Sequence, residues 1–266
     1  MLRFCSLASG STGNATLVEA SGGITSTRLL VDCGLSQREL AKRLAEHGSS
    51  VEAIDAIFIT HEHGDHIGCS LALAQRHRLP IWMSRGTWRA VSARAEGLDT
   101  NLLNFSKDGV ELALGDLSVR PYQVPHDANE PLQLTVSDGA SRLGILTDAG
   151  SCTAIMVEHL AACQALLLEC NHDTDLLANG TYPPRLQARI RGTHGHLSNT
   201  QAAQVLANVW QRKNHAGLQH LVAAHLSEQN NRPSLARAAL AAVIACDEAE
   251  IGVADPILGC AWRTLS

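Results

Sequence analysis

The sequence THEHGDHIG, residues 60–68, stands where the apolar run IDAIFIT is followed by a helical pattern at residues 66–77. It gathers three histidines and an aspartate within six residues, His61, His63, Asp65 and His66. Burying these side chains without partners would cost several kcal/mol. Imidazole and carboxylate are ligand types that Zn²⁺ and related divalent ions bind. The stretch therefore predicts a metal-binding loop, with a solvated polar loop as the alternative.

The spacing inside this loop predicts two groups of ligands. In an extended segment alternate side chains share a direction, so His61 and His63 are expected to point the same way. Asp65 and His66 follow the turn at Gly64 and are free to face a second ion.

Three further polar residues directly follow expected strands: His126 in YQVPHDA, Asp148 in LGILTDAG and His225 in LVAAHLS. Each alone is typical of a capping or core polar residue. Together with the loop they make seven donors, enough for two divalent ions, Zn²⁺ or Mn²⁺. We assign His61, His63 and His126 to one ion and Asp65, His66 and His225 to the other, with Asp148 bridging.

Apolar runs and helical patterns alternate in the first and last thirds of the chain, with strands at near-hairpin spacing between them. This order predicts sheet packed on sheet with helices outside, an α/β four-layer αββα sandwich. One domain, residues 1–266, is expected. Strands are expected at residues 2–8, 14–20, 27–32, 54–60, 110–113, 117–124, 131–137, 141–147, 165–169 and 218–224, and helices at residues 36–48, 66–77, 198–211 and 233–246.

Composition narrows the function classes. A chain of 266 residues with 45% apolar residues is long enough for a full core. The net charge of −5 argues against a surface that wraps nucleic acid throughout, and 3% aromatic residues argue against a base-stacking platform for single strands. This composition does not exclude a local basic patch that contacts nucleic acid.

The cellular setting is expected to be the cytoplasm. The eight cysteines form no CxxC or CxC pair and mostly lie in or beside apolar runs, which is typical of reduced core residues. No signal peptide is evident, and no apolar run approaches the ~20 residues of a membrane span.

A catalytic acid is suggested by ECNHD, residues 169–173, and GHLSN, residues 195–199. Cleavage of a phosphodiester needs a proton for the leaving oxygen, and histidine is the usual donor. A carboxylate behind that histidine raises its pKa and orients its ring. We expect Glu169 to support His196 in this way. The alternative is that His196 only caps a helix, with Ser198 or Asn199 as the true N-cap.

The motif HEHGDH resembles the HxHxDH motif of the metallo-β-lactamase fold superfamily, and His126, Asp148 and His225 follow in that family's order. The resemblance covers nearly the whole chain. It implies that Asp32, in LLVDCG, orients a ligand histidine. A simple cap at the end of the strand is the alternative for Asp32.

Further motifs resemble the phosphodiesterase branch, which includes tRNase Z-type nucleases and PhnP-type phosphodiesterases. The YycJ (WalJ)-like group is more similar still, through LASGSTGNATLVE, THEHGDHIGC, ECNHD, GHLSN and AHLSEQNNRP. This resemblance implies a 5′→3′ exonuclease-like activity on DNA. The chain lacks room between Asp148 and His225 for the β-CASP domain of RNase J-type enzymes, and it shows no insertion like the tRNA-clamping arm of tRNase Z.

Substrate contacts are expected near these residues. The loop SGSTGN, residues 9–14, could hold phosphate with its backbone amides, or form an ordinary tight turn. Arginines on helix faces could neutralise a nucleic-acid backbone, although such side chains are usually only solvated. The candidate substrate-binding residues are Ser11, Asn14, His172, Ser227 and Asn230.

The sequence thus predicts a dinuclear metal-dependent phosphodiesterase, a nuclease on DNA. A metal-bound hydroxide attacks phosphorus with Asp65 orienting it, and His196, backed by Glu169, protonates the leaving group. One alternative is a hydrolase of thioesters, lactones or lactams, either glyoxalase II-like or lactamase-like. Another is a metal-binding regulator without enzymatic activity.

Overall fold

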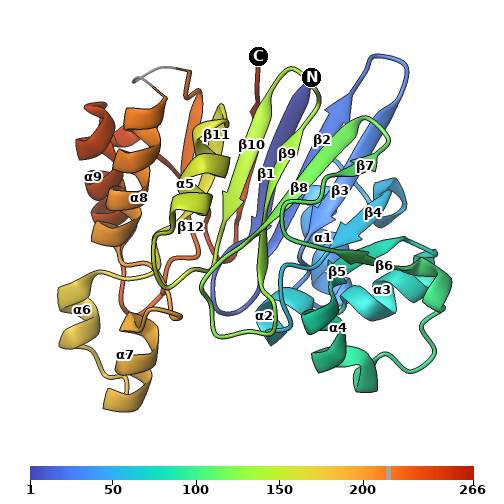
Figure 1. Ribbon diagram of the computed structural model, residues 1–266, viewed down its shortest axis with the longest axis horizontal. Helices are drawn as coiled ribbons and strands as arrows, with labels where there is room; N and C mark the ends of the chain where they lie inside the picture. The colour runs from blue at the N-terminus through green and yellow to red at the C-terminus, as the bar shows by residue number, and fades with distance from the viewer. Residues whose placement is uncertain (214–216) are drawn as a thin grey trace.

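The computed structural model describes residues 1–213 and 217–266 and contains two seven-stranded mixed sheets (Figure 1). The first sheet has the order β14-β1-β2-β3-β4-β5-β6, in which β3 to β6 are parallel and the other neighbours antiparallel. Its strands are β1 Leu2–Ala8, β2 Ala15–Ser21, β3 Ser26–Val31, β4 Ala56–Phe58, β5 Ile81–Ser84, β6 Leu103–Ser106 and β14 Cys260–Thr264.

The second sheet has the order β13-β12-β11-β10-β9-β8-β7, in which β10 to β13 are parallel and β7 to β10 antiparallel. Its strands are β7 Leu112–Leu114, β8 Leu117–Gln123, β9 Leu132–Ser137, β10 Arg142–Leu146, β11 Ala165–Glu169, β12 His220–Ala224 and β13 Gly252–Val253. Neighbouring parallel strands need a crossover connection, which is usually a helix, whereas antiparallel strands can be joined by a short hairpin. The helical segments between strands therefore account for the parallel parts of both sheets.

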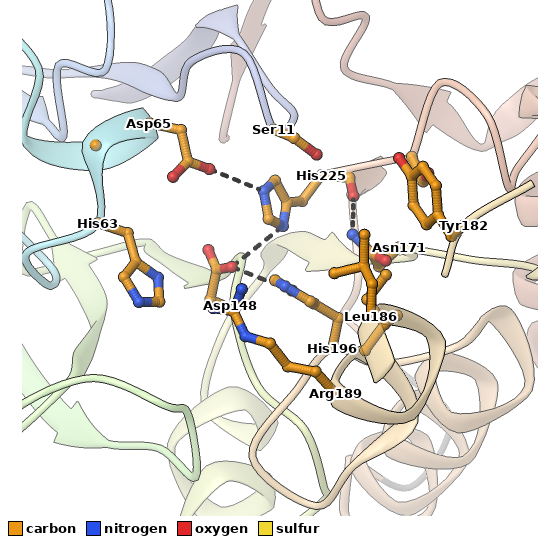
Figure 2. A pocket seen from close by; sticks show the side chains of 13 residues that line it. Ser11, His63, Asp65, Asp148, Asn171, Tyr182, Leu186, Arg189, His196 and His225 are labelled. Carbon is orange, nitrogen blue, oxygen red and sulfur yellow. Dashed lines mark hydrogen bonds and ion pairs between the residues drawn. The ribbon is translucent and has the colours of Figure 1, made fainter. Parts of the chain in front are cut away.

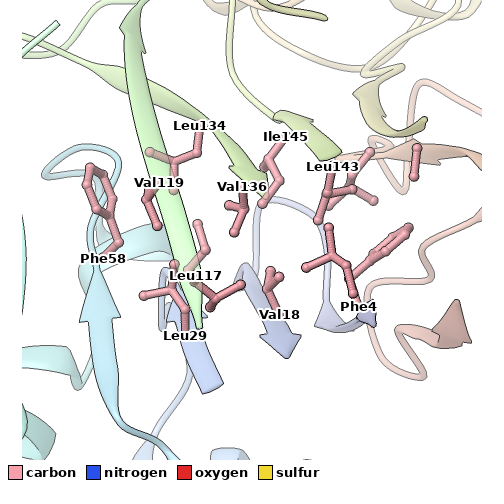
Figure 3. Close-up of a cluster of buried hydrophobic side chains, with 14 of the residues drawn as sticks. Phe4, Val18, Leu29, Phe58, Leu117, Val119, Leu134, Val136, Leu143 and Ile145 are labelled. Atoms are coloured by element: carbon pink, nitrogen blue, oxygen red, sulfur yellow. The ribbon is translucent and has the colours of Figure 1, made fainter. Parts of the chain in front are cut away.

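Both faces of each sheet are covered, which explains the continuous apolar runs in the sequence. In β11, Ala165 and Leu167 face the core between the sheets, and Leu166 and Leu168 face the outer helices. Figure 3 shows the central core, where Phe4 and Val18 of one sheet pack near Leu143 and Ile145 of the other.

Helices cover the outer faces and complete the predicted αββα layers (Figure 1). The first sheet is covered by α1 Gln37–Glu46, α3 Ser70–His77 and α4 Arg85–Val91, and the second by α5 Ala154–Ala161, α8 Asn199–Arg212 and α9 Pro233–Ile244. The short helices α2 Gly64–Ile67, α6 Thr174–Ala178 and α7 Pro184–Arg191 lie near one edge of the sandwich. The predicted fold class is confirmed, and the single domain of residues 1–266 stays a prediction.

Two expectations need correction. The helix expected at residues 66–77 is two helices, α2 and α3, because Gly68 lies against the chain after β3, where a Cβ would be 2.3 Å from the carbonyl oxygen of Cys33. The cysteines are also not all core residues, since Cys152 is exposed. The short strands β5 and β6 and the helices α4 to α7 were not predicted, because their apolar stretches are too brief for a clear period.

Among the described residues, no helix is long and apolar enough to cross a membrane.

Candidate metal centre

The expected metal ligands meet at one edge of the sandwich, just beyond the carboxyl ends of strands from both sheets. Parallel strands end at the same edge, so residues far apart in sequence come together there. His61 follows β4, His126 follows β8, Asp148 follows β10 and His225 directly follows β12.

Three histidines form the first cluster. Nδ1 of His63 lies 3.1 Å from Nε2 of His61 and 3.3 Å from Nε2 of His126. His61 and His126 are buried, whereas the side chain of His63 is 28% exposed. The ring nitrogens therefore converge on one point that is open to solvent on the His63 side.

A second cluster consists of Asp65, His66 and His225. Oδ2 of Asp65 lies 3.6 Å from Nε2 of His66 and 3.6 Å from Nε2 of His225. Asp65 lies in the first turn of α2, and its close packing requires Gly34, where a Cβ would lie 1.8 Å from the carbonyl oxygen of Asp65.

Asp148 lies between the clusters and is almost fully buried. Its Oδ2 is 3.0 Å from Nε2 of His66, and its Oδ1 is 3.8 Å from Nε2 of His126. The structure thus brings all seven expected ligands together, in one cluster of three histidines and one of an aspartate and two histidines with Asp148 between them, which is consistent with a dinuclear site. Which residue binds which ion, and whether Asp148 bridges, stay predictions.

Hydrogen bonds orient two of these rings. Nδ1 of His66 donates to Oδ2 of Asp32 over 2.8 Å, and Asp32 also accepts from the backbone and hydroxyl of Thr60. Asp32 adopts a positive φ of 59°, an uncommon conformation for a residue other than glycine. Nδ1 of His126 donates to the carbonyl oxygen of Gly195 over 3.0 Å. In both rings this leaves Nε2 for the cluster, as ligand histidines require.

Burial keeps two of the histidines neutral. It holds the pKa of His61 well below its ordinary value, and the charge of His66 lowers this pKa further. Burial likewise lowers the pKa of His126. A neutral imidazole has a free lone pair, so these rings are ready to bind a metal ion.

The other two buried ligand histidines, His66 and His225, are paired with carboxylates. Burial alone would lower the pKa of His66, but Asp148 and Asp32 raise it to about 10. His225 behaves in the same way, and Asp148 raises its pKa to about 10. Burial would raise the pKa of Asp148, but His225 and His66 hold it well below its ordinary value. The cluster therefore contains buried carboxylate charge, which either protons or a metal ion can neutralise.

Two buried atoms support the metal interpretation. Oδ2 of Asp148 and Nε2 of His225 make no hydrogen bond of normal geometry with any described residue. Buried polar atoms normally have such a partner. Both atoms face other ligand candidates, and the donor set of imidazole and carboxylate suits a divalent ion, so the residues present fit a bound metal.

Glu169, at the end of β11, contacts the expected acid. Its Oε1 lies 2.8 Å from Nδ1 of His196, and its Oε2 accepts from the backbone amides of Ala149 and Leu197. Ser198 caps α8 through its hydroxyl, together with Gln201 in a capping box. His196 is therefore not the helix cap.

The surroundings of His196 favour its protonated form. Burial would lower its pKa, but Asp148 and Glu169 raise it to about 10. Its neighbour His194 is exposed.

A cavity of about 380 Å³ lies beside the clusters, and His196, Asp148 and His225 turn toward one another on its wall (Figure 2). Two expected substrate-binding residues, Ser11 and Ser227, line this cavity. Asn171, α7 and the loop before α7 also line the cavity, and this contribution was not predicted from the sequence. The missed lining residues are Asn171, Tyr182, Leu186 and Ile190.

The structure places the other three expected substrate contacts, Asn14, His172 and Asn230, outside the lining of this cavity. Nδ2 of Asn14 lies 3.4 Å from Oδ2 of Asp65 and 3.0 Å from Nε2 of His66, so it contacts ligand candidates instead. The amides of Gly10 and Gly13 are occupied inside their own loop. These bonds are typical of a tight turn, and a phosphate cradle in residues 9–14 stays a prediction.

Comparison with known proteins agrees with this architecture. The profile of the β-lactamase superfamily domain matches residues 27–216. The chain is 32% identical over 254 residues to exodeoxyribonuclease YycJ of Bacillus anthracis, with 96% of this chain and 92% of the relative covered. The chain belongs to the metallo-β-lactamase superfamily. Exodeoxyribonuclease WalJ of Streptococcus pneumoniae is also 32% identical, over 94% of this chain and 90% of that protein.

Solved structures of the metallo-β-lactamase superfamily share the fold over nearly the whole chain. The protein YhfI from Bacillus subtilis has a TM-score of 0.74 and 17% identity, with 99% of this chain and 100% of that chain covered. The short form of human tRNase Z has a TM-score of 0.63 at 16% identity, covering 99% of both chains. A diphosphatase of the PhnP family has a TM-score of 0.64 and 16% identity, with 100% of this chain and 98% of that chain covered. The resemblance to these groups is confirmed.

Proposed function

We propose that this metallohydrolase is a phosphodiesterase that degrades DNA as a 5′→3′ exonuclease. The observation that carries the proposal is the pair of Glu169 and His196, with 2.8 Å between Oε1 and Nδ1, at the wall of the cavity. Hydrolysis of a thioester does not need such an acid, because a thiolate leaves readily, whereas an alkoxide leaving group does. The names of the two relatives, both exodeoxyribonucleases, support DNA as the substrate.

Two divalent ions, Zn²⁺ or Mn²⁺, are proposed as cofactors. His61, His63 and His126 would hold one, Asp65, His66 and His225 the other, and Asp148 would contact both. Bound there, the ions would neutralise phosphate charge and activate water. The imidazole-rich set suits Zn²⁺, and Mn²⁺ is the alternative that availability could favour.

The protein's own groups perform the remaining steps. Asp65, with its side chain 24% exposed, accepts a hydrogen bond from the attacking water and orients it toward phosphorus. His196 uses Nδ1 for Glu169, which leaves Nε2–H to protonate the departing oxygen. Glu169 acts through His196 and is a positioning residue. Asp32 has the same role for His66.

Digestion of 3′-labelled single- and double-stranded DNA and RNA tests the proposal, with Zn²⁺ or Mn²⁺ added to the metal-stripped protein. We expect progressive loss of nucleotides from the 5′ end of DNA. Bis-p-nitrophenyl phosphate, a thioester and nitrocefin are assayed in parallel. Turnover of the thioester or nitrocefin alone would overturn the proposal in favour of a carboxylic-ester or lactam hydrolase. Metal binding without any turnover would indicate a regulator.

A further inference from the structure

Helix α7 and the loop before it contribute one wall of the cavity. Arg189 and Ile190 lie three and four residues after Leu186 in α7, so these side chains share a face of the helix, and Tyr182 lines the same cavity from the loop before it. Tyr182 and Leu186 lie on the side of the cavity away from His63 (Figure 2). This wall is apolar and partly aromatic, whereas the opposite wall carries the ligand clusters.

The position of Tyr182 is set by its neighbours. Nε2 of Gln187 donates to the carbonyl oxygen of Tyr182 over 3.0 Å. Gly180 packs against Asn230, and a Cβ at Gly180 would lie 2.6 Å from Oδ1 of Asn230. Asn230 in turn donates from its backbone to the hydroxyl of Ser227, a lining residue. The loop is thus tied to Asn230 and, through it, to the lining residue Ser227, and these contacts hold the backbone of Tyr182 beside the cavity.

Arg189 extends from the same face of α7. Its Nε donates to Oδ2 of Asp127 over 2.5 Å, and Oδ1 of Asp127 lies 3.9 Å from Nε2 of His63. The terminal nitrogens of Arg189 make no hydrogen bond with a described residue. Asp127 therefore holds the guanidinium near the first cluster with two donor groups free, which suits a phosphate oxygen.

The size of the cavity limits what it takes. At about 380 Å³ it is at the low end of small-molecule pockets, which suits one nucleotide and is too small for a stacked run of bases. A phosphate between the clusters and Arg189 would bring the attached nucleoside toward the wall of Tyr182 and Leu186. Base–aromatic stacking accepts any base, because every base has a flat face.

We propose that Tyr182, Leu186 and Arg189 form a subsite for a single terminal nucleotide, in which Tyr182 stacks on the base and Arg189 binds the phosphate. This inference rests on the proposed phosphodiesterase function and deepens it. It assigns the recognition of a strand end to α7 and its preceding loop. Arg185 and Arg191 are exposed residues of the same helix that do not line the cavity, so they have no part in the subsite.

Two chromogenic phosphodiesters separate the role of the base from that of the phosphate: thymidine 3′-(p-nitrophenyl) phosphate, which joins the nucleoside to phosphorus through its 3′ oxygen as a 5′-terminal nucleotide is joined, and methyl p-nitrophenyl phosphate. They share the phosphate and the leaving group, but only the first carries a base. For the Mn²⁺- or Zn²⁺-loaded wild type we expect kcat/KM to be about tenfold or more higher for the thymidine ester. Tyr182→Phe and the control Arg185→Ala keep this ratio, and Tyr182→Ala reduces it to near unity.

Arg189→Ala is expected to lower kcat/KM for both esters alike, by about tenfold, because both carry the phosphate. Tyr182→Leu keeps an apolar side chain without the ring, and it should bring the ratio of the two kcat/KM values near unity as Tyr182→Ala does. Because leucine still fills much of the space, this result would not be explained by a folding defect. Inhibition gives a second readout: thymidine 3′-monophosphate should inhibit better than inorganic phosphate, and Tyr182→Ala should abolish that difference.

Three results would overturn the subsite: equal wild-type rates on the two esters, a preference that survives in Tyr182→Ala and Tyr182→Leu, or an Arg189→Ala variant that matches Arg185→Ala. In each of these cases the phosphodiesterase function still stands. Failure of the wild type on both esters and on DNA would instead overturn the proposed function and the subsite with it.

Discussion

Glu169 contacts His196 across 27 residues of chain, with 2.8 Å between Oε1 and Nδ1. The same Oε1 lies 3.3 Å from Nδ1 of His225. One buried carboxylate oxygen thus connects the proposed proton donor with a proposed metal ligand. Deletion of each partner has a distinct expected result.

His196→Ala should keep both metal ions and lose ~10²–10⁴-fold in kcat on DNA, because only the proton donor is removed. Metal content by mass spectrometry and single-turnover rates check this. His196 also lies within reach of Asp148, Glu169 and His225 as a possible ligand set, so loss of metal from this variant would show that His196 is a ligand.

Glu169→Gln should reduce the rate through His196. An amide keeps the shape of the side chain and still accepts from the amides of Ala149 and Leu197, but it is a poor partner for a protonated ring. Combined with His196→Ala, it should cause little further loss of rate, since the residue it positions is already absent. Fully additive losses would contradict a positioning role.

His225→Ala should lose metal from one site, because it removes an imidazole ligand and leaves only Asp65, His66 and the shared Asp148 for that ion. His194→Ala is the matched control, since His194 is exposed, and it should keep both ions and full activity. Metal-to-protein ratios after gel filtration measure the outcome. Two ions retained in the His225 variant would refute its assignment.

Asp32→Asn should weaken metal binding by ~10–100-fold, the usual effect of removing the partner of a ligand histidine. Asparagine tolerates the positive φ of 59° at this position, so the backbone is not strained by the change. Competition with a chelator gives the affinities. An unchanged affinity would favour the alternative in which Asp32 only caps the strand.

Asp138→Asn tests electrostatics far from the site. Burial would raise the pKa of Asp138, but the amides of Ser141 and Ala140 and the amino group of Met1 lower it. A depressed carboxyl pKa stabilises the fold fully above the unfolded value near 4, and this stabilisation is lost progressively as the pH falls from there through the lowered pKa of the folded state. The variant should be less stable by up to about 1 kcal/mol near pH 7, and the difference should shrink toward about pH 3.5.

Urea unfolding of wild type and the Asp138 variant at these two pH values provides the check. A stability difference that grows on acidification would have the wrong sign for this pair.

The sequence alone was enough for the fold class and the ligand candidates. Their physical signals are local: apolar runs mark strands buried on both faces, and a metal site concentrates His61, His63, Asp65 and His66 in one loop. Polar residues directly after apolar runs, such as Asp148 and His225, could be recognised because ligands gather at the carboxyl ends of strands.

Only the tertiary structure decided how these residues meet. The sharing of Glu169 between His196 and His225 depends on the parallel pairing of β11 and β12, which no local pattern reports. The contribution of α7 to the cavity wall could not be predicted from the sequence either. Its apolar spacing at Leu186 and Ile190 marks one face of a helix, but the sequence does not say what that face contacts. Contacts between distant segments depend on how the layers pack, so the cavity wall became visible only in the folded chain.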